Sequence, residues 1–319
     1  MKSILIPAHI FQELETARVQ QSLDVRFIPY SEDITEAVDP EESVAIFRWI
    51  AGTRYAELID RTPFILWLHT ASAGVDHVIT PTVKSRDGMI LTDSGPAFGQ
   101  AIAEFVFAAM LSDARRLVET AANQKAHIWE KLPQRELFGA TIGIVGLGPI
   151  GLSIAALAKA FGMTTLGFRR TSKPAANVDE VLTGADGLRK LLEQSQYVVV
   201  AAALTGDTGN LIDADGLAAM RPDAQLINIG RGGLVDESAL IDVLRNNVIR
   251  AAVLDVFTTE PLPSDSVLWD LPNVVITPHH SFGASAGLKA RQIGIFLDNV
   301  RNYIDGKPLD NVVDIVRGY

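Results

Sequence analysis

IGIVGLGPIG, residues 142–151, sets three glycines directly after a short apolar run and directly before an alanine-rich segment. The apolar run predicts a buried strand, and PIGLSIAALAKAFG (149–162) predicts a helix that closes at a glycine. Glycines between a strand and a helix are the context in which this pattern indicates a dinucleotide-binding turn. A turn that serves packing alone is the alternative, and the strand-turn-helix context favours dinucleotide binding over it.

Each glycine of this turn has an expected role. Gly146 permits the tight turn, Gly148 lets a pyrophosphate approach the backbone, and Gly151 lets the helix pack closely on the strand. Pro149 suits the first helical turn, where its missing N–H is not needed. The helix N-terminus, which includes Ile150, would hold the phosphates. We therefore expect these five residues to bind the cofactor.

Strands and helices alternate along most of the chain. Early strands are expected at SILIPA, VRFIP, VAIFRW, FILWLHTA and MILTD, and later ones at MTTLGFRR, YVVVAAAL, AQLINIG, AAVLDVF and VVITPHH. Helices are expected between several of them, for example at LRKLLEQS and ESALIDVLRNN. Such alternation predicts parallel βαβ units, and apolar strands fit a sheet covered on both faces. The fold class is therefore α/β.

Composition limits the kinds of partner. The chain has 319 residues, which suggests roughly two domains, and its net charge of −10 argues against a nucleic-acid partner. The absence of cysteine excludes disulfides, thiolate nucleophiles and Cys-ligated zinc; we expect no metal site and a cytoplasmic location. Pro7 and His9 interrupt the first apolar run, so it resembles a strand more than a signal peptide. The longest apolar runs are too short to span a membrane.

The end of the strand MTTLGFRR bears on the choice of cofactor. An acid is usual there to bind the adenosine ribose, but the next carboxylate after the strand is Asp179. Arg169 and Arg170 occupy the place instead, and Thr171 follows them, with Ser172 and Lys173 beyond. Such donors suit a 2′-phosphate and predict a preference for NADP(H), with NAD(H) as the second choice. A solvated basic loop is the alternative.

Three polar residues follow the ends of consecutive predicted strands. Arg231 ends INIG, Glu260 follows AAVLDVF, and His279 ends VVITP. Ligands of an open α/β sheet bind at the carboxyl ends of its strands, so these side chains can converge there. An arginine fork matches the oxygens of a 2-oxo acid, and histidine exchanges protons near neutral pH. A carboxylate beside the histidine fixes its tautomer. Spacing alone leaves His280 as a rival to His279.

The chain resembles the D-isomer-specific 2-hydroxyacid dehydrogenase family, which includes glyoxylate/hydroxypyruvate reductases and phosphoglycerate dehydrogenase. The resemblance covers nearly the whole chain, in the family's order. It is carried by SAGVDHV (72–78), IAEFVFAAML (102–111), IGIVGLGPIG (142–151), LINIGRGGLVDESAL (226–240), AAVLDVFTTEPLP (251–263) and LPNVVITPH (271–279).

The resemblance implies roles for particular residues. Arg231 orients the substrate, His279 is the general acid/base, and Glu260 supports it; the family histidine directly follows the proline, which selects His279 over His280. Asp255 matches an aspartate near the nicotinamide amide. The remaining expected cofactor contacts are Leu204, Thr208, Ile229 and Gly230.

The substrate would bind in part to residues before the glycine turn. Backbone N–H groups of Ser72, Ala73 and Gly74 are expected to form a small nest for its carboxylate, although a plain glycine turn is the alternative. Arg48 is expected to reach the same pocket, because the family often has an arginine near that position.

The family fold implies a Rossmann-type cofactor domain at residues 98–284. A smaller flavodoxin-like α/β substrate domain would be built from residues 1–97 and 285–319. The resemblance also implies a homodimer, with the apolar segment IAEFVFAAMLSDARR at its interface. The expected activity is NADPH-linked reduction of a small 2-oxo acid, such as glyoxylate or hydroxypyruvate, to a D-2-hydroxy acid. The alternatives are an NAD-dependent dehydrogenase working oxidatively and a non-catalytic, corepressor-like dinucleotide sensor.

Overall fold

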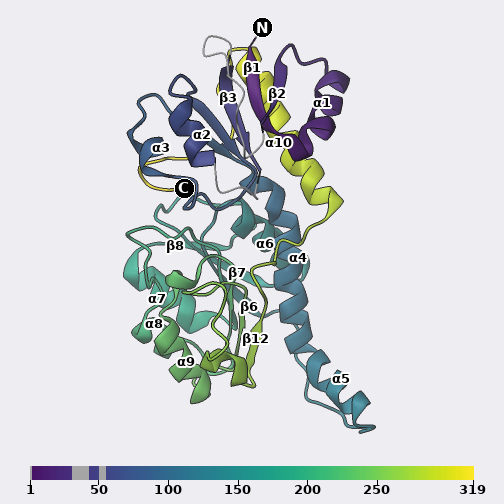
Figure 1. The fold of residues 1–319 in the computed structure, drawn as a ribbon. Coiled ribbons are helices and arrows are strands. Elements are labelled where there is room, and N and C mark those ends of the chain that lie inside the picture. The colour runs from purple at the N-terminus through teal and green to yellow at the C-terminus, as the bar shows by residue number, and fades with distance from the viewer. Residues whose placement is uncertain (1, 31–42, 50–54) are drawn as a thin grey trace. The chain divides into compact units, whose positions relative to one another are not determined.

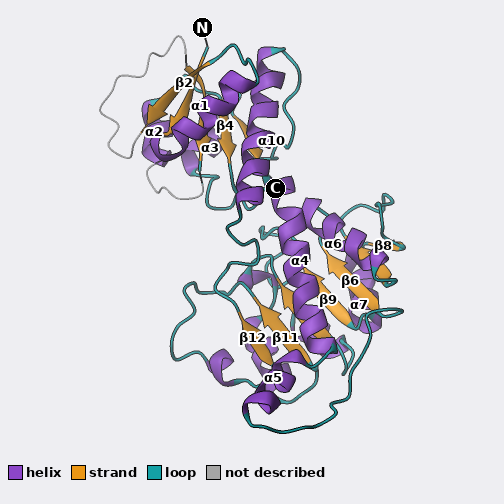
Figure 2. Ribbon diagram, turned by 90° about the vertical axis from the view of Figure 1, so that its right-hand side faces the viewer, coloured by secondary structure: helices purple, strands orange, loops and turns teal. Residues whose placement is uncertain are grey.

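The computed structural model describes residues 2–30, 43–49 and 55–319 (Figure 1). The chain divides into two compact units. The terminal unit comprises Met1–Phe98 and Ala284–Tyr319, and the central unit comprises Gly99–Gly283. Each unit contains its own parallel sheet with helices packed on it, so the predicted α/β class is confirmed (Figure 2).

The terminal unit is built on a five-stranded sheet of order β2-β1-β3-β4-β5, and every strand pair in it is parallel. This is the flavodoxin-like order. The strands are β1 (Ser3–Pro7), β2 (Arg26–Tyr30), β3 (Ser43–Arg48), β4 (Trp67–Thr70) and β5 (Ile90–Asp93). The helices are α1 (Phe11–Gln20), α2 (Tyr55–Arg61), α3 (Pro81–Ser85), the first turn of α4 (Gly95–Ala114), and α10 (Ala286–Ile304).

Both faces of this sheet are buried because side chains along a strand alternate between them. Ile4 and Phe47 belong to the cluster under α1 and α10. Their neighbours Leu5 and Ile46 belong to the other cluster, under α2 and α3. The uninterrupted apolar strands of the sequence are thus explained by two covering layers of helices.

The central unit is built on a seven-stranded parallel sheet of order β12-β11-β10-β9-β6-β7-β8. Strand order reverses between β6 and β9, which is the switch point where ligands of doubly wound sheets bind. The strands are β6 (Thr141–Val145), β7 (Thr164–Phe168), β8 (Glu180–Leu182), β9 (Tyr197–Val200), β10 (Gln225–Asn228), β11 (Ala251–Leu254) and β12 (Val274–Ile276). The helices are most of α4, α5 (Leu117–Lys125), α6 (Pro149–Ala160), α7 (Gly184–Gln194), α8 (Ala214–Ala219) and α9 (Glu237–Arg245).

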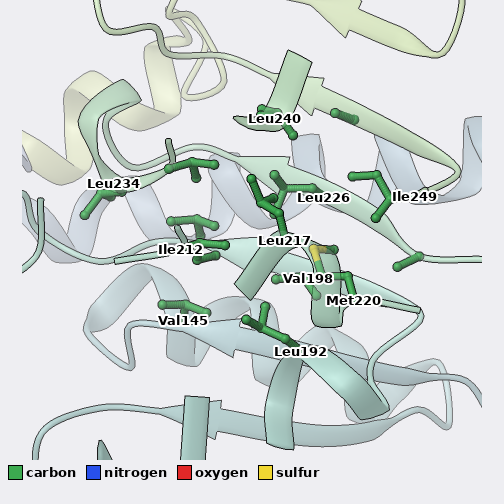
Figure 3. Packing of buried hydrophobic residues seen from close by; sticks show 14 of the residues in the cluster. Val145, Leu192, Val198, Ile212, Leu217, Met220, Leu226, Leu234, Leu240 and Ile249 are labelled. Atoms are coloured by element: carbon green, nitrogen blue, oxygen red, sulfur yellow. The ribbon is translucent and has the colours of Figure 1, made fainter. Parts of the chain in front are cut away.

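Helices α7, α8 and α9 cover one face of the central sheet, and α4 and α6 cover the other (Figure 1). Leucine, isoleucine and valine side chains from β9, β10 and the helices above them fill the layer under α7–α9 (Figure 3). Leu192 and Leu217, from α7 and α8, pack there with Val198 and Leu226. This core fixes the strand ends from which the candidate site is built.

Several elements were not predicted, among them the helices α1, α5 and α10 and two short elements, β8 and α8. Strand β8 has three residues and lies at the sheet edge, and α8 has six residues, too few for a periodic apolar pattern. Helix α8 is capped by Asp213, whose side chain accepts a hydrogen bond from Gly216 N.

Helix α4 is the one helix, among the described residues, long and apolar enough by length and composition to cross a membrane. Half of its apolar window is buried inside the structure, as in a core helix of a globular unit.

Candidate active site

The glycine turn lies at the carboxyl end of β6, at the switch point. Gly146 has φ +105, and a Cβ placed there would lie 2.6 Å from Ala202 N. A Cβ at Gly151 would lie 2.0 Å from Gly146 O, so α6 meets the turn backbone to backbone. A Cβ placed on Gly148 would have no neighbouring atom within 4 Å. The turn therefore leaves its backbone open at the residue where a diphosphate would approach, which fits a dinucleotide.

The basic segment after β7 forms a loop that its own arginine holds together. Arg169 Nε donates to Thr171 O at 3.2 Å, and Arg169 Nη2 donates to the carbonyls of Lys173 and Pro174. Arg170 and Thr171 are exposed. Asp179, the first carboxylate in the sequence after β7, pairs with Lys159 and accepts from Thr165 N at the start of β7. It is thus held at the opposite end of the strand from the expected ribose site.

The other expected cofactor contacts surround the ends of β9 and β10. Leu204 is partly exposed in the loop after β9, and Thr208 Oγ1 donates to Ala203 O at 2.7 Å within the same loop. Ile229 and Gly230 are buried, and Ile229 N donates to Val200 O. These residues border the switch point, but their contacts with a dinucleotide remain predictions.

The turn that carries Arg231 is fixed by a residue that the sequence analysis did not select. The buried Asn228 accepts from Gly230 N with Oδ1 at 3.2 Å and donates from Nδ2 to Arg231 O at 3.0 Å. Arg231 Nη1 donates to Gly230 O at 2.8 Å. A polar residue ending an apolar strand, as in LIN, was the signal that could have identified Asn228.

Arg231 and Glu260 lie on segments whose backbones touch. A Cβ at Gly232 would lie 1.9 Å from the carbonyl carbon of Phe257, so only glycine permits this approach. Phe257 N in turn donates to Glu260 Oε1 at 3.0 Å. Two segments about thirty residues apart in sequence are therefore joined at the carboxyl edge of the sheet.

Glu260 and His279 form a hydrogen-bonded pair, with Glu260 Oε2 2.7 Å from His279 Nδ1. Both side chains are partly exposed, at 35% and 40% respectively. The carboxylate accepts the Nδ1 proton, which leaves Nε2 as the ring nitrogen available for proton exchange. His280 is exposed, and its backbone N–H donates to Asp255. The structure thus separates the two histidines that spacing alone did not.

Asp255 is fully buried and braces the histidine segment. Its Oδ1 accepts from Thr277 Oγ1 at 2.6 Å and from His280 N at 2.9 Å, and its Oδ2 accepts from Ser281 N at 3.0 Å. These bonds hold in place the residues on both sides of His279. The contact of Asp255 with a nicotinamide amide stays a prediction.

In the terminal unit, the expected substrate residues gather at the carboxyl edge of the sheet. The buried Arg48, at the end of β3, donates from Nη1 to Thr70 Oγ1 at 3.2 Å, and Thr70 Oγ1 lies 2.8 Å from Ser72 Oγ. Ser72 N donates to the same Thr70 oxygen at 3.4 Å. The N–H groups of Ala73 and Gly74 donate to no acceptor among the described residues. The expected nest therefore reduces to Ala73 and Gly74.

Comparisons with known proteins give this arrangement a context. The sequence profile described as D-isomer specific 2-hydroxyacid dehydrogenase, NAD binding domain, matches residues 107–281. Glyoxylate/hydroxypyruvate reductase B of Pectobacterium atrosepticum is 35% identical over 264 residues, covering 81% of this chain and 82% of that protein. D-3-phosphoglycerate dehydrogenase of Mycobacterium leprae is 32% identical over 99% of this chain, which spans only 59% of that longer protein.

A solved structure is similar over the full length. The D-isomer specific 2-hydroxyacid dehydrogenase of Xanthobacter autotrophicus Py2, crystallised with NADPH and MES, has a TM-score of 0.83 and 31% identity. The match covers 100% of this chain and 99% of that one.

Proposed function

The chain belongs to the D-isomer specific 2-hydroxyacid dehydrogenase family, and from that premise we propose that it reduces a small 2-oxo acid with NADPH to a D-2-hydroxy acid. The observation that carries the proposal is the Glu260–His279 pair, joined through the Phe257 backbone to the turn that bears Arg231. The name of the Pectobacterium relative, a glyoxylate/hydroxypyruvate reductase, supports a small 2-oxo acid as the substrate.

NADPH, when bound, supplies the hydride. Arg231 binds the substrate carboxylate and carbonyl oxygen with its planar fork. His279 Nε2 donates a proton to the carbonyl oxygen as it becomes a hydroxyl, and Glu260 holds the ring through Nδ1. The N–H groups of Ala73 and Gly74 bind the carboxylate. A protein that only senses a dinucleotide has no need of this proton-transfer pair.

The preference for NADPH is proposed from the loop after β7. Arg169, Arg170 and Thr171 supply donors where a ribose-binding carboxylate would otherwise stand, and Asp179 is engaged elsewhere. The solved Xanthobacter relative was crystallised with NADPH, which supports this choice. A single charge-assisted contact to the 2′-phosphate would give roughly tenfold discrimination.

The test is a panel of 2-oxo acids assayed with NADPH and with NADH at one fixed salt concentration. We expect turnover of glyoxylate or hydroxypyruvate, with kcat/KM at least about tenfold higher for NADPH. Arg169→Asp should lower kcat/KM for NADPH and spare that for NADH. No turnover of any 2-oxo acid would contradict the activity, and an NADH preference in the parent would contradict the cofactor assignment.

We also propose which unit binds which ligand and how the chain assembles. We place the cofactor on the central unit and the substrate carboxylate on the terminal unit. We propose a homodimer because the family resemblance implies one. The absence of cysteine supports a cytoplasmic location, the net charge of −10 argues against a nucleic-acid partner, and the short apolar runs of the sequence argue against a membrane partner.

A further inference from the structure

Behind the Ser72–Gly74 loop, the terminal unit buries a chain of four polar side chains that the proposed reaction does not use. They come from β4, β5 and the residue after β5, and each is at most 1% exposed: Trp67, His69, Thr92 and Ser94. Burying polar groups is unfavourable unless each is hydrogen-bonded. The His69 ring packs against the stacked rings of Phe47 and Phe296, with centroid distances of 5.3 and 5.2 Å.

The four side chains are linked in series. Trp67 Nε1 donates to Thr92 Oγ1 at 2.9 Å, and Thr92 Oγ1 lies 2.7 Å from His69 Nδ1. His69 Nε2 lies 3.1 Å from Ser94 Oγ. The short contact suits a hydroxyl donor and the longer one an N–H donor. We therefore assign the Thr92 hydroxyl as donor to Nδ1 and the Nε2 proton as donor to Ser94. Burial lowers the pKa of His69 to about 3, which keeps the ring neutral.

Ser94 connects this series to the substrate loop. Ser94 N donates to Ser72 O at 3.3 Å. Because the peptide bond is planar and trans, a carbonyl drawn toward Ser94 turns the Ala73 N–H of the same peptide the opposite way. The buried Gln292 also holds this loop, by donating from Nε2 to Ala71 O at 2.7 Å. The carbonyls of Ala71 and Ser72 are thus both bonded to buried residues, and the Ala73 N–H is left for a ligand.

We propose that His69 is a positioning residue for the substrate: by holding Ser94, it fixes the direction in which the Ser72–Ala73 peptide presents its N–H to the substrate carboxylate. The inference rests on the proposed function, in which this loop binds that carboxylate. His69 itself touches no reacting atom. Its loss should therefore weaken substrate binding and leave the chemical step and NADPH binding nearly unchanged.

Two substitutions at His69 separate positioning from packing. His69→Gln puts an amide nitrogen near the place of Nε2 and keeps the bond to Ser94. His69→Asn, with a shorter side chain, reaches only the place of Nδ1 and keeps the bond to Thr92. We expect His69→Asn to raise the KM for glyoxylate by about tenfold with little change in kcat or in the KM for NADPH. His69→Gln should keep the parent KM.

A double-mutant cycle tests whether the effect passes through Ser94. Ser94→Ala should raise the glyoxylate KM as His69→Asn does, and the double variant should be no worse than either single one. Thr62→Val is the matched control for lost stability, since Thr62 is buried in the same unit and its hydroxyl bonds only to backbone of its own helix. It should lower Tm without changing the KM.

Three results would overturn the proposal: additive effects at His69 and Ser94, equal KM values for His69→Gln and His69→Asn, or a raised KM in Thr62→Val. If the parent protein is active and any of these results is found, the inference about His69 is wrong but the proposed function is not contradicted. A parent that reduces no 2-oxo acid contradicts the proposed function and the inference with it.

Discussion

At the scale of single residues, His279 has a backbone conformation that side-chain-bearing residues rarely adopt. Its φ is +49, in the left-handed region, and its N–H donates to both Asp255 O and Thr277 O. Such a conformation costs on the order of 1–3 kcal/mol and is kept only where neighbouring groups hold the backbone in place. The Asp255 carboxylate holds the backbone here, because it accepts hydrogen bonds from Thr277, His280 and Ser281. The catalytic candidate is thus aimed by a buried acid that does not touch its ring.

The assignment of the acid/base to His279 predicts different effects at adjacent positions. His279→Ala should lower kcat by at least about 100-fold, because the group that donates the proton is lost. His280→Ala should change kcat little, since His280 contributes only its backbone N–H to the network and alanine retains it. Glu260→Gln should lower kcat less than His279→Ala does, because an amide oxygen can still accept from Nδ1. The measurement is kcat at saturating NADPH and substrate. A larger loss at His280 than at His279 would refute the assignment.

The site residues that could be predicted from the sequence differ from those that could not in where their bonding partners lie. Arg231, Glu260 and His279 follow strand ends within recognisable motifs, so their convergence was predictable. His69 and Ser94 bond to each other across two segments of the chain, and only coordinates reveal such a pair. Asn228 bonds within its own turn, so a polar residue at a strand end was the available signal for it. The bonds of Asp255 to residues 277–281 could not be predicted from the sequence, because they depend on how that segment folds over the buried carboxylate.

At the scale of elements, apolar runs identified most strands and the helices α4, α6, α7 and α9, because both sheets are covered on both faces. Helix α10 was not identified, since polar residues alternate with its apolar ones. The short elements β8 and α8 escaped, since neither is long enough to show a period. The apolar pattern also did not show where α4 starts. Asp93 lies just before it, and its Oδ1 accepts from Gly95 N, the first residue of the helix, at 2.7 Å.

Asp93 makes the stability of this helix start depend on pH. Burial raises the pKa of Asp93 to about 6, and the hydrogen bond from Gly95 offsets only part of that rise. The folded protein therefore binds a proton that the unfolded chain releases between about pH 4 and 6, so stability falls as pH rises through that window. Asp93→Asn keeps the acceptor and removes the charge. It should raise Tm at pH 8 and leave Tm at pH 4 nearly unchanged.

A matched control for this element is Asp213→Asn, at the start of α8. Asp213 Oδ1 makes the same kind of bond, to Gly216 N at 2.9 Å, but the residue is exposed. Its substitution should change Tm by a similar small amount at both pH values. Equal gains at pH 4 and pH 8 in Asp93→Asn would show that the Asp93 charge costs the fold nothing.

At the scale of the whole molecule, the proposed homodimer can be tested on the segment that follows α4. Helix α5 buries none of its side chains, and Leu117 and Val118 are 53% and 63% exposed. Trp129, in the segment after it, is 98% exposed. Exposed apolar groups gathered on one segment mark an interaction site more often than single ones do. We propose that a second copy of the chain covers them. The family resemblance implies a dimer interface on IAEFVFAAMLSDARR (102–116), and this segment directly follows it.

Sedimentation equilibrium should therefore give a mass near twice the 34.5 kDa of one chain. Replacing both Leu117 and Val118 with lysine should shift the mass toward one chain, because two ammonium groups cannot be buried unpaired in an apolar interface. Val316→Lys is the control: Val316 is 93% exposed but belongs to the terminal unit, away from α5 in sequence, so the mass should not change. A parent that sediments as a single chain would contradict the homodimer. A lysine double variant that remains a dimer would place the interface elsewhere, since the side chains of Leu117 and Val118 would then stay in solvent in the assembly.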